Sequence, residues 1–410
     1  MPTPVFVCGA ECGVTGGGTT FAMAGTSANG HWQTMDTGWT VDSSFFAPGG
    51  STRSYKIATT TTAKQLARTF AAASNFAVAR FKIMWTTLPS TATLVAWFDG
   101  GTSICGLRYN GGNLEMYQKS TGTTQIGPAV VTGRWYTVEM KWDTSANPWL
   151  GSWQVDGVPY GNVSAAAVAA TRTGFIVGND LSATQTMYVD DMIVSQTLAD
   201  YPIGDGVVLG LNPISDGLHS FTAGDFKYDS SGGTNVLTTA TDVYTHIDDT
   251  IDNTTDSIFQ VVIRTTGYVE VRFKSLPWQL PDGRGIKAIN GIAVVGGFHA
   301  SASTACTCSL RIEDGATESA VFALLSPGAT SIVNFYKMYA TSPAASVPWQ
   351  RGTLNGLLAR FGYSSDVTPF PACDSLVIEA DVAPTRLQHE LVRQMMSTSP
   401  QPQASLVQVL

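Results

Sequence analysis

Two adjacent carboxylates in the stretch MYVDDMIVS, residues 187 to 195, are the first candidates for chemistry. Asp190 and Asp191 stand side by side within an apolar run, where charged side chains are rare unless they have a partner. Such a pair can serve as a general acid and base, as part of a metal site, or as a structural element at the end of a folding unit. The backbone that carries the pair decides among these roles.

The segment around the pair is predicted to be a β-strand. Successive side chains of a strand point to opposite faces of the sheet, so Asp190 and Asp191 are not expected to converge on one substrate atom. We expect one of them to face solvent and the other to cap a turn or to bond a neighbouring loop. Calcium ligation by Asp99, Asp190 or Asp191 is the alternative, so no cofactor is expected unless a structural calcium is bound.

Carboxylate pairs suited to sugar hydrolysis are not found in the sequence. Glycosidases place two carboxylates about 5 to 10 Å apart around the scissile bond, and sandwich-fold glucanases supply them from one strand in an E-x-D-x-E pattern. Here Glu139 is followed by Asp143 without a third acid. The nucleophile-elbow, phosphate-loop and dinucleotide-binding patterns also lack a counterpart in the expected strand and helix setting. We therefore expect a protein that is not an enzyme.

Tryptophans are the second group of candidate functional residues, and the chain has 10 of them. Trp149 in SANPWLG and Trp278 in LPWQLPDG lie in segments rich in turn residues. Exposed aromatic rings can stack on sugar rings, whereas buried ones fill the ends of a β-sandwich. Trp149 and Trp278 are the candidate carbohydrate-binding residues, with core packing as the alternative for each.

Charge and hydropathy limit the partners. The net charge is −8, and the 23 Lys and Arg residues form no basic cluster, so nucleic acid is not an expected partner. No apolar run reaches the length of roughly 18 residues needed to span a bilayer, so membrane insertion is not expected. The start, MPTPVFVCGAECG, lacks the basic and long apolar regions of a secretion signal, which predicts synthesis in a cytoplasm.

Short alternating segments predict the elements that must position these residues. In VARFKIM, residues 78 to 84, Phe81 and Ile83 fall on one strand face and Arg80 and Lys82 on the other. Turn residues between such segments predict hairpins at YNGGNLEMY (109 to 117) and SWQVDGVPYG (152 to 161). Many short strands of this kind favour two packed antiparallel sheets over one open sheet.

A chain of 410 residues favours two domains. The turn-rich segment TLADYPIGDG, residues 197 to 206, separates two alternating patterns and predicts a boundary near residue 200. We expect an all-β protein of two antiparallel β-sandwiches, residues 1 to 200 and 201 to 383. Residues 384 to 410 are expected to form a short helix and a tail.

The expected helix, PTRLQHELVRQMMS, spans residues 384 to 397. Leu387, Leu391 and Met395 are spaced four apart, which places them on one helix face. An apolar face on a terminal helix followed by a polar tail favours contact with a neighbouring subunit. These three residues are the candidate assembly contacts.

The closing segments of the first unit carry a resemblance to a known family. The succession TVEMKWD, WQVDGVPYG and MYVDDMIVS resembles the last strands of the laminin G-like or concanavalin A-like jelly-roll sandwich, a broad family of lectins, adhesion modules and some glycoside hydrolases. The resemblance covers about half of the chain. It implies a jelly-roll fold for residues 1 to 200.

The order of segments also resembles tail-associated minor structural proteins of tailed bacteriophages. In those proteins a laminin G-like sandwich ends in a YVDD-type strand, and a linker leads to a second β domain that begins with an LGxxxxxxxPxxDG-like stretch. The matching residues here are Tyr188 to Asp191, then Leu209 and Gly210, Pro213, Asp216 and Gly217. The linker IGDGVVLG is shorter than usual in that arrangement.

This second resemblance implies a non-enzymatic virion structural protein that is made in the host cytoplasm. Its implied partners are copies of itself, in a trimer or a higher ring, and other virion proteins. The alternative is a glycan-binding adhesin or host-attachment module, in which loops of the first sandwich bind a host surface polysaccharide.

Overall fold

The structure is a computed structural model of the 410-residue chain. The residues it describes are 2–11, 32, 34–36, 38–59, 62–99, 102–119, 121–167, 172–179, 183–217, 226–230, 233–236, 243–246, 256–260, 268–299, 306–312, 322–324, 333–342, 346–362 and 372–385.

The first sandwich is built from two antiparallel sheets. Within the described residues, the nine-stranded sheet contains β1 (Pro4–Cys8), β3 (Trp39–Asp42), β4 (Ser54–Thr59), β6 (Phe76–Thr87), β11 (Tyr136–Asp143), β12 (Trp149–Val155), β13 (Val158–Pro159), β14 (Val163–Ala165) and β16 (Gln185–Ser195). The described strands of the seven-stranded sheet are β2 (Thr34–Met35), β5 (Lys64–Ser74), β7 (Thr91–Asp99), β8 (Thr102–Asn110), β9 (Asn113–Gln118), β10 (Thr124–Ala129) and β15 (Arg172–Asn179).

Both predicted hairpins of this sandwich are confirmed. β8 and β9 pair on either side of Gly111 and Gly112, which have φ values of 55° and 99°. β12 and β13 pair around Asp156 and Gly157, with φ values of 52° and 75°. Two successive residues with positive φ match the twist of the flanking strands, and Gly and Asp tolerate that backbone best.

The second sandwich begins after η2 (Leu198–Asp200) and also has two antiparallel sheets. Within the described residues, its seven-stranded sheet contains β17 (Val207–Leu211), β19 (Phe226–Ser230), β20 (Gly233–Val236), β21 (Asp256–Gln260), β23 (Ile286–His299), β26 (Val333–Tyr339) and β28 (Ala372–Pro384). The described strands of the five-stranded sheet are β18 (Pro213–Asp216), β22 (Tyr268–Phe273), β24 (Cys306–Ile312), β25 (Phe322–Leu324) and β27 (Leu357–Gly362). Two short helices accompany these strands, η3 (Val243–His246) and α1 (Arg351–Asn355).

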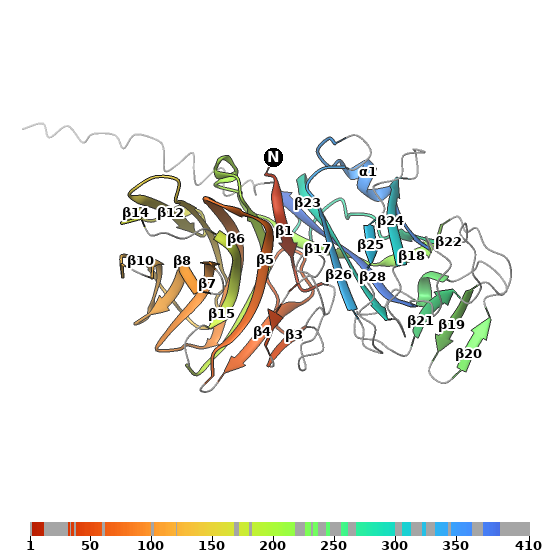
Figure 1. Cartoon of the computed structure of the whole chain (residues 1–410), viewed down its shortest axis with the longest axis horizontal. Helices are drawn as coiled ribbons and strands as arrows, with labels where there is room; N and C mark the ends of the chain where they lie inside the picture. Colours follow the sequence, from red (N-terminus) through yellow and green to blue (C-terminus); the bar gives the residue numbers. More distant parts are fainter. Residues whose placement is uncertain are drawn as a thin grey trace, which may run out of the picture.

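The two sandwiches stand side by side, and β1 runs between them (Figure 1). β1 pairs with β16 of the first sandwich and also contacts β23, β26 and β28 of the second. The core of the first sandwich therefore continues into the second, where Tyr336 and Val377 belong to the same buried cluster as Phe6 and Trp32. A second cluster, centred on β23, β28 and α1, fills the second sandwich.

The prediction of an all-β protein made of two antiparallel β-sandwiches is confirmed. β28 continues to Pro384, where Ile286 pairs with it, so the predicted C-terminal helix does not begin before Thr385. The remainder of that predicted segment, residues 386 to 410, lies outside the described residues. The helix that the structure does describe near this end of the chain, α1, follows the buried Trp349.

Candidate functional site

A buried set of charged side chains joins the two sandwiches, and we call it the ionic junction. It contains Glu11, Arg80, Lys82, Asp190, Asp191 and Asp381, of which Arg80, Asp190, Asp191 and Asp381 have no exposed surface. Alternation places Arg80 and Lys82 on the face of β6 opposite Phe81 and Ile83. This face is covered by β28 and the loop at residues 44–51, with Arg80 0% and Lys82 4% exposed.

Arg80 crosses from the first sandwich to the second. Its guanidinium forms an ion pair with Asp381 of β28 and donates to the Asp191 carbonyl oxygen at 3.4 Å. Asp381 also accepts a hydrogen bond from the Asn290 side chain at 2.7 Å. Burial lowers the pKa of Arg80, but the carboxylates around it, chiefly Asp381 with Asp191 and Asp205, together raise it overall, so the guanidinium stays charged.

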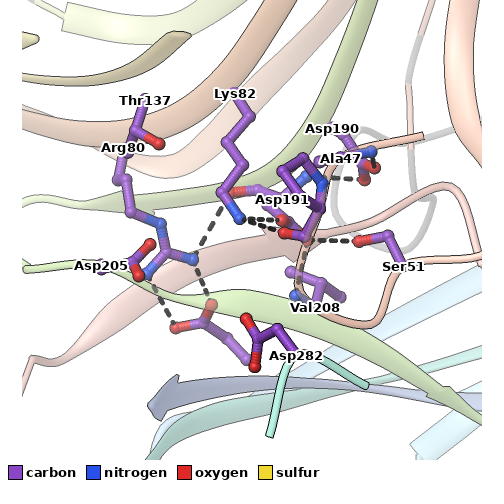
Figure 2. A network of polar contacts seen from close by, with 12 residues as sticks. Ala47, Ser51, Arg80, Lys82, Thr137, Asp190, Asp191, Asp205, Val208 and Asp282 are labelled. Atoms are coloured by element: carbon purple, nitrogen blue, oxygen red, sulfur yellow. Dashed lines mark hydrogen bonds and ion pairs between the residues drawn. The ribbon is translucent and has the colours of Figure 1, made fainter. Parts of the chain in front are cut away.

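Lys82 and Asp191 form the second ion pair of the junction, with an N–O distance of 2.8 Å. The other oxygen of Asp191 accepts hydrogen bonds from the Ser51 hydroxyl at 2.9 Å and from the Val208 backbone N–H at 2.6 Å. Figure 2 shows Lys82 on one side of this carboxylate and Ser51 on the other. Because Val208 belongs to β17, Asp191 ties the last strand of the first sandwich to the first strand of the second.

Asp190 is held by backbone donors. Its carboxylate accepts from Ala47 N–H at 2.9 Å and from Asp191 N–H at 2.7 Å. Burial, followed by the nearby charges of Asp191 and Glu11, raises the pKa of Asp190 well above its ordinary value. The neutral acid is therefore favoured, and it removes one negative charge from a crowded site.

The positions of the two adjacent aspartates correct the prediction that one of them faces solvent. Both are fully buried, and both bond to the loop at residues 44–51. The register against β6 shifts between Asp190 and Ile193, and Asp191 has a φ of 49°. This bulge breaks the strict alternation on which the prediction rested. Asp is one of the few residues besides glycine that adopts this conformation readily.

Glu11 completes the cluster of buried acids. It is 8% exposed, and its carboxylate accepts from Thr52 N–H at 2.8 Å, the Thr52 hydroxyl at 2.6 Å and Arg53 N–H at 3.2 Å. Burial outweighs these hydrogen bonds and raises the pKa of Glu11 to about 7. No sequence pattern marks Glu11, because its partners lie in a loop about 40 residues further along the chain.

The rim of the junction is partly exposed. Arg284 pairs with Asp205 of the linker and with Asp282 at 2.7 Å. Burial alone would raise the pKa of Asp205, but the charges of Lys82 and Arg284 lower it, so this carboxylate is ionised. Gly49 packs against Val207 and Arg284 at a φ of 118°, where a side chain would collide with Val207. The loop at residues 44–51 thus fits against both the linker and the second sandwich.

The carboxylates of the junction accept donors from the protein itself and have little or no exposed surface, so their contacts join the two sandwiches. Among the described residues, no group of three or more His, Cys, Asp and Glu side chains is placed to hold a metal ion. The side chain of Asp99, the third predicted calcium ligand, lies outside the described residues. Calcium binding by Asp99, Asp190 and Asp191 stays a prediction.

Glu139, the acid considered for glycosidic cleavage, also has an internal role. It is 4% exposed and accepts hydrogen bonds from the Gln154 side chain at 2.6 Å and from Gly204 N–H at 2.8 Å. Gly204 lies in the linker, so Glu139 holds the connection between the sandwiches from the side of β11.

The two candidate tryptophans have opposite environments. Trp149 is 2% exposed and belongs to the first core, which corrects the prediction that it offers a ring face to a sugar. It is the first residue of β12 and pairs with Ala165, so its side chain points inward with Gly151 and Trp153. Trp278 is 81% exposed, and the guanidinium of Arg351 lies 4.4 Å from its ring centroid.

The candidate assembly residues Leu387, Leu391 and Met395 lie outside the described residues. In the part of the chain that the structure describes, no helix combines the length and apolar character required to cross a membrane.

No protein-family model and no curated protein matches the chain. Among solved structures, the catalytic domain of a glycoside hydrolase family 131 protein from Coprinopsis cinerea is 16% identical, with a TM-score of 0.35, over 48% of this chain and 95% of that one. An alginate lyase from Corynebacterium sp. is 11% identical, with a TM-score of 0.30, over 40% of this chain and 84% of that one.

A sialidase is 16% identical, with a TM-score of 0.29, over 40% of this chain, which spans only 17% of the sialidase. These similarities concern folds that share β-sandwich architecture. At such identities and TM-scores they carry no argument about activity.

Proposed function

We propose that this protein is a non-enzymatic structural subunit of a tailed-bacteriophage virion, associated with the tail and assembled with copies of itself into a symmetric oligomer. The proposal rests on the resemblance of its segment order to minor structural proteins of such phages. The structure adds one supporting observation.

The supporting observation concerns the residues that carry the resemblance. Tyr188 to Asp191 lie in β16, Leu209 and Gly210 in β17, and Pro213 and Asp216 in β18. These strands lead from the first sandwich into the second, and Asp191 accepts the hydrogen bond of Val208 N–H across the boundary. The shared pattern therefore coincides with the joint between the domains.

A joint of this kind suits a subunit that must keep a fixed shape. Domains connected by a flexible linker change their relative orientation freely, whereas an extensive buried interface favours a fixed one. Here the Arg80 to Asp381 pair, the Asp191 hydrogen bonds and the continuous apolar core all cross the boundary. A fixed spacing between two sandwiches is what repeated packing in a symmetric assembly requires.

The test is to locate the protein in purified phage particles. Mass spectrometry of the particles and cryo-electron microscopy of the tail are expected to find it in multiple symmetric copies. Native mass measurement of the isolated protein is expected to show a trimer or a larger ring. A protein that is absent from particles and monomeric in solution would overturn the proposal.

The predicted assembly contacts are tested by the same measurement. Replacing Leu387, Leu391 and Met395 by Ser together is expected to lower the oligomeric state without lowering the melting temperature of the sandwiches. An unchanged native mass in this variant would place the assembly contacts elsewhere on the chain.

A second candidate function is attachment to a host surface glycan, and the exposure of Trp278 favours it. The ring of Trp278 is 81% exposed, and an exposed aromatic ring can stack on a sugar ring. Glycan binding that is lost in Trp278→Ala is expected under this function. Loss of binding on chelation would point to the predicted calcium instead, and a protein that binds no glycan would exclude this function.

A further inference from the structure

Trp278 is held in an exposed position by buried neighbours on either side. Leu276 is 3% exposed and Leu280 is 2% exposed, and both belong to the core of the second sandwich. The segment between them bears Pro277, Trp278 and Gln279, all of which face solvent. The indole is therefore presented on a short anchored arch and does not depend on a long loop.

Arg351 fixes the arch from the side of α1. Its guanidinium donates to the Leu276 carbonyl oxygen at 3.0 Å and to the Pro277 carbonyl oxygen at 2.7 Å. Asn355, at the other end of α1, accepts a hydrogen bond from Leu276 N–H at 2.9 Å. These bonds hold the guanidinium 4.4 Å from the Trp278 ring centroid, within the range of a cation–π contact.

Both the Arg351 guanidinium and the Trp278 indole can still bind a ligand. A guanidinium has five N–H donors. Two hydrogen bonds join those of Arg351 to the carbonyl oxygens of Leu276 and Pro277. No carboxylate among the described residues forms an ion pair with Arg351, whereas Arg284 pairs with two carboxylates and Arg360 with one. Because Arg351 covers one face of the indole, the other face remains for a ligand.

We propose that Trp278 and Arg351 form a binding site for an acidic oligosaccharide, with one sugar ring stacked on the free face of the indole and the carboxylate of a neighbouring unit, beyond the edge of the indole, bound by the guanidinium. This inference rests on the second function proposed above and names its ligand class. Sugar rings stack through their apolar faces on a single aromatic ring. A planar guanidinium favours a carboxylate, to which it can donate two parallel hydrogen bonds.

A saccharide fits this site better than a protein partner does. A stable protein interface buries about 800 Å² on each partner around several anchors. Trp278 is a single ring, and most of the other strongly exposed large hydrophobic residues of the described chain, including Ile126, Leu150 and Val158, belong to the first sandwich. One ring next to one cation that has no ion pair among the described residues matches the size of two linked sugar units, one of them charged.

The test is a glycan array that carries uronic-acid and sialylated oligosaccharides alongside neutral counterparts, followed by calorimetry of the best ligand and its methyl ester. The full chain is expected to bind acidic saccharides, and to bind them more weakly at high salt. Trp278→Ala is expected to lower affinity roughly tenfold or more for both the acid and the ester. Arg351→Gln is expected to remove the preference for the acid over the ester.

Two control variants check that these effects are local. Leu150→Ala removes another exposed hydrophobic side chain, and Arg134→Gln removes another guanidinium that lies over an aromatic ring, that of Tyr136. Both are expected to bind like the unaltered protein, and these two variants and Trp278→Ala should share its melting temperature.

The outcomes separate this inference from the function on which it rests. Binding of neutral saccharides alone would overturn the acidic specificity and leave glycan attachment standing. Binding of acidic saccharides that survives both Trp278→Ala and Arg351→Gln would overturn the site. An array without any bound saccharide would overturn both the inference and the attachment function.

Discussion

At the scale of single residues, Arg80 shows how strongly the joint depends on one charge. Its side chain is wholly buried, as is that of Asp381, and the pair spans the two sandwiches. Desolvation of both ions costs free energy, so such a pair is not itself a large source of stability. The loss of one partner is strongly destabilising, because it leaves the other charge buried and uncompensated.

Arg80→Ala is therefore expected to lower the free energy of unfolding by about 3–5 kcal/mol. Urea denaturation followed by tryptophan fluorescence measures the loss. Arg134→Ala is the matched control, since its pair with Asp156 has side chains 59% and 33% exposed and such pairs contribute about 1 kcal/mol or less. Equal losses in the two variants would contradict a special role for the buried pair.

Glu11 makes the stability contributed by the ionic junction depend on pH. Its pKa is raised from 4.5 to about 7, chiefly by burial, so the folded protein binds this proton more tightly than the unfolded chain does. Stability due to Glu11 is then complete below about pH 4.5 and falls as pH rises to 7, by roughly 3 kcal/mol in total. Asp190, whose pKa is also raised, acts in the same direction.

Denaturation curves between pH 4.5 and 8 measure this dependence. Glu11→Gln keeps a carbonyl oxygen that can accept from Thr52 N–H but cannot ionise, so its stability is expected to fall less across the same interval. A variant whose stability follows the same pH curve as the unaltered protein would show that Glu11 does not titrate there.

At the scale of elements, the linker between Ser195 and Val207 is shaped by Arg80. A methyl group on Gly206 would overlap the Arg80 guanidinium, which cannot move without leaving Asp381. Gly206→Ala is therefore expected to destabilise the protein by about 1–3 kcal/mol. Gly352→Ala is the control, because nothing lies within 4 Å of its added methyl group and alanine favours the helix.

Differential scanning calorimetry of the two glycine variants tests this packing. The melting temperature of Gly206→Ala should fall and that of Gly352→Ala should stay or rise slightly. A Gly206→Ala protein that melts like the unaltered chain would mean that Arg80 has another position available to it.

The elements also show how far sequence reasoning reaches. Alternation and turn residues predicted the strands and both hairpins, because these depend on neighbours in the chain. The burial of Arg80 and Lys82 was not predictable in this way, since Arg80 contacts Gly206 and Asp381 and Lys82 contacts Pro48, all of them distant along the chain. Trp149 was misplaced for a related reason: the turn residues before it end at β12, whose first residue points into the core.

At the scale of the whole molecule, the apolar core of the first sandwich extends into the second. Tyr336 of β26 packs against Phe6 of β1 and exchanges hydrogen bonds with Val7, which donates at 2.7 Å and accepts at 3.0 Å. Val208, Ala293 and Val377 extend the same cluster. Exposing this surface by separating the sandwiches would be costly.

Thermal unfolding is therefore expected to occur in one cooperative transition for both sandwiches. In Arg80→Ala the coupling is weakened, and calorimetry is expected to resolve two transitions or one broadened transition. Two well-separated transitions in the unaltered protein would contradict a shared core, because domains that unfold independently do not depend on a common interface.

The position of β1 has a consequence for how the chain folds. Its residues are synthesised before the rest of the first sandwich, yet it pairs with β16, and Val7 bonds a tyrosine 329 residues further on. Contacts so distant in sequence require the closure of large loops and slow the search for the native state. Until β26 has been synthesised, the apolar side of β1 lacks its partner in the second sandwich. The nascent chain then avoids aggregation only by binding a chaperone or by folding quickly once β26 is available.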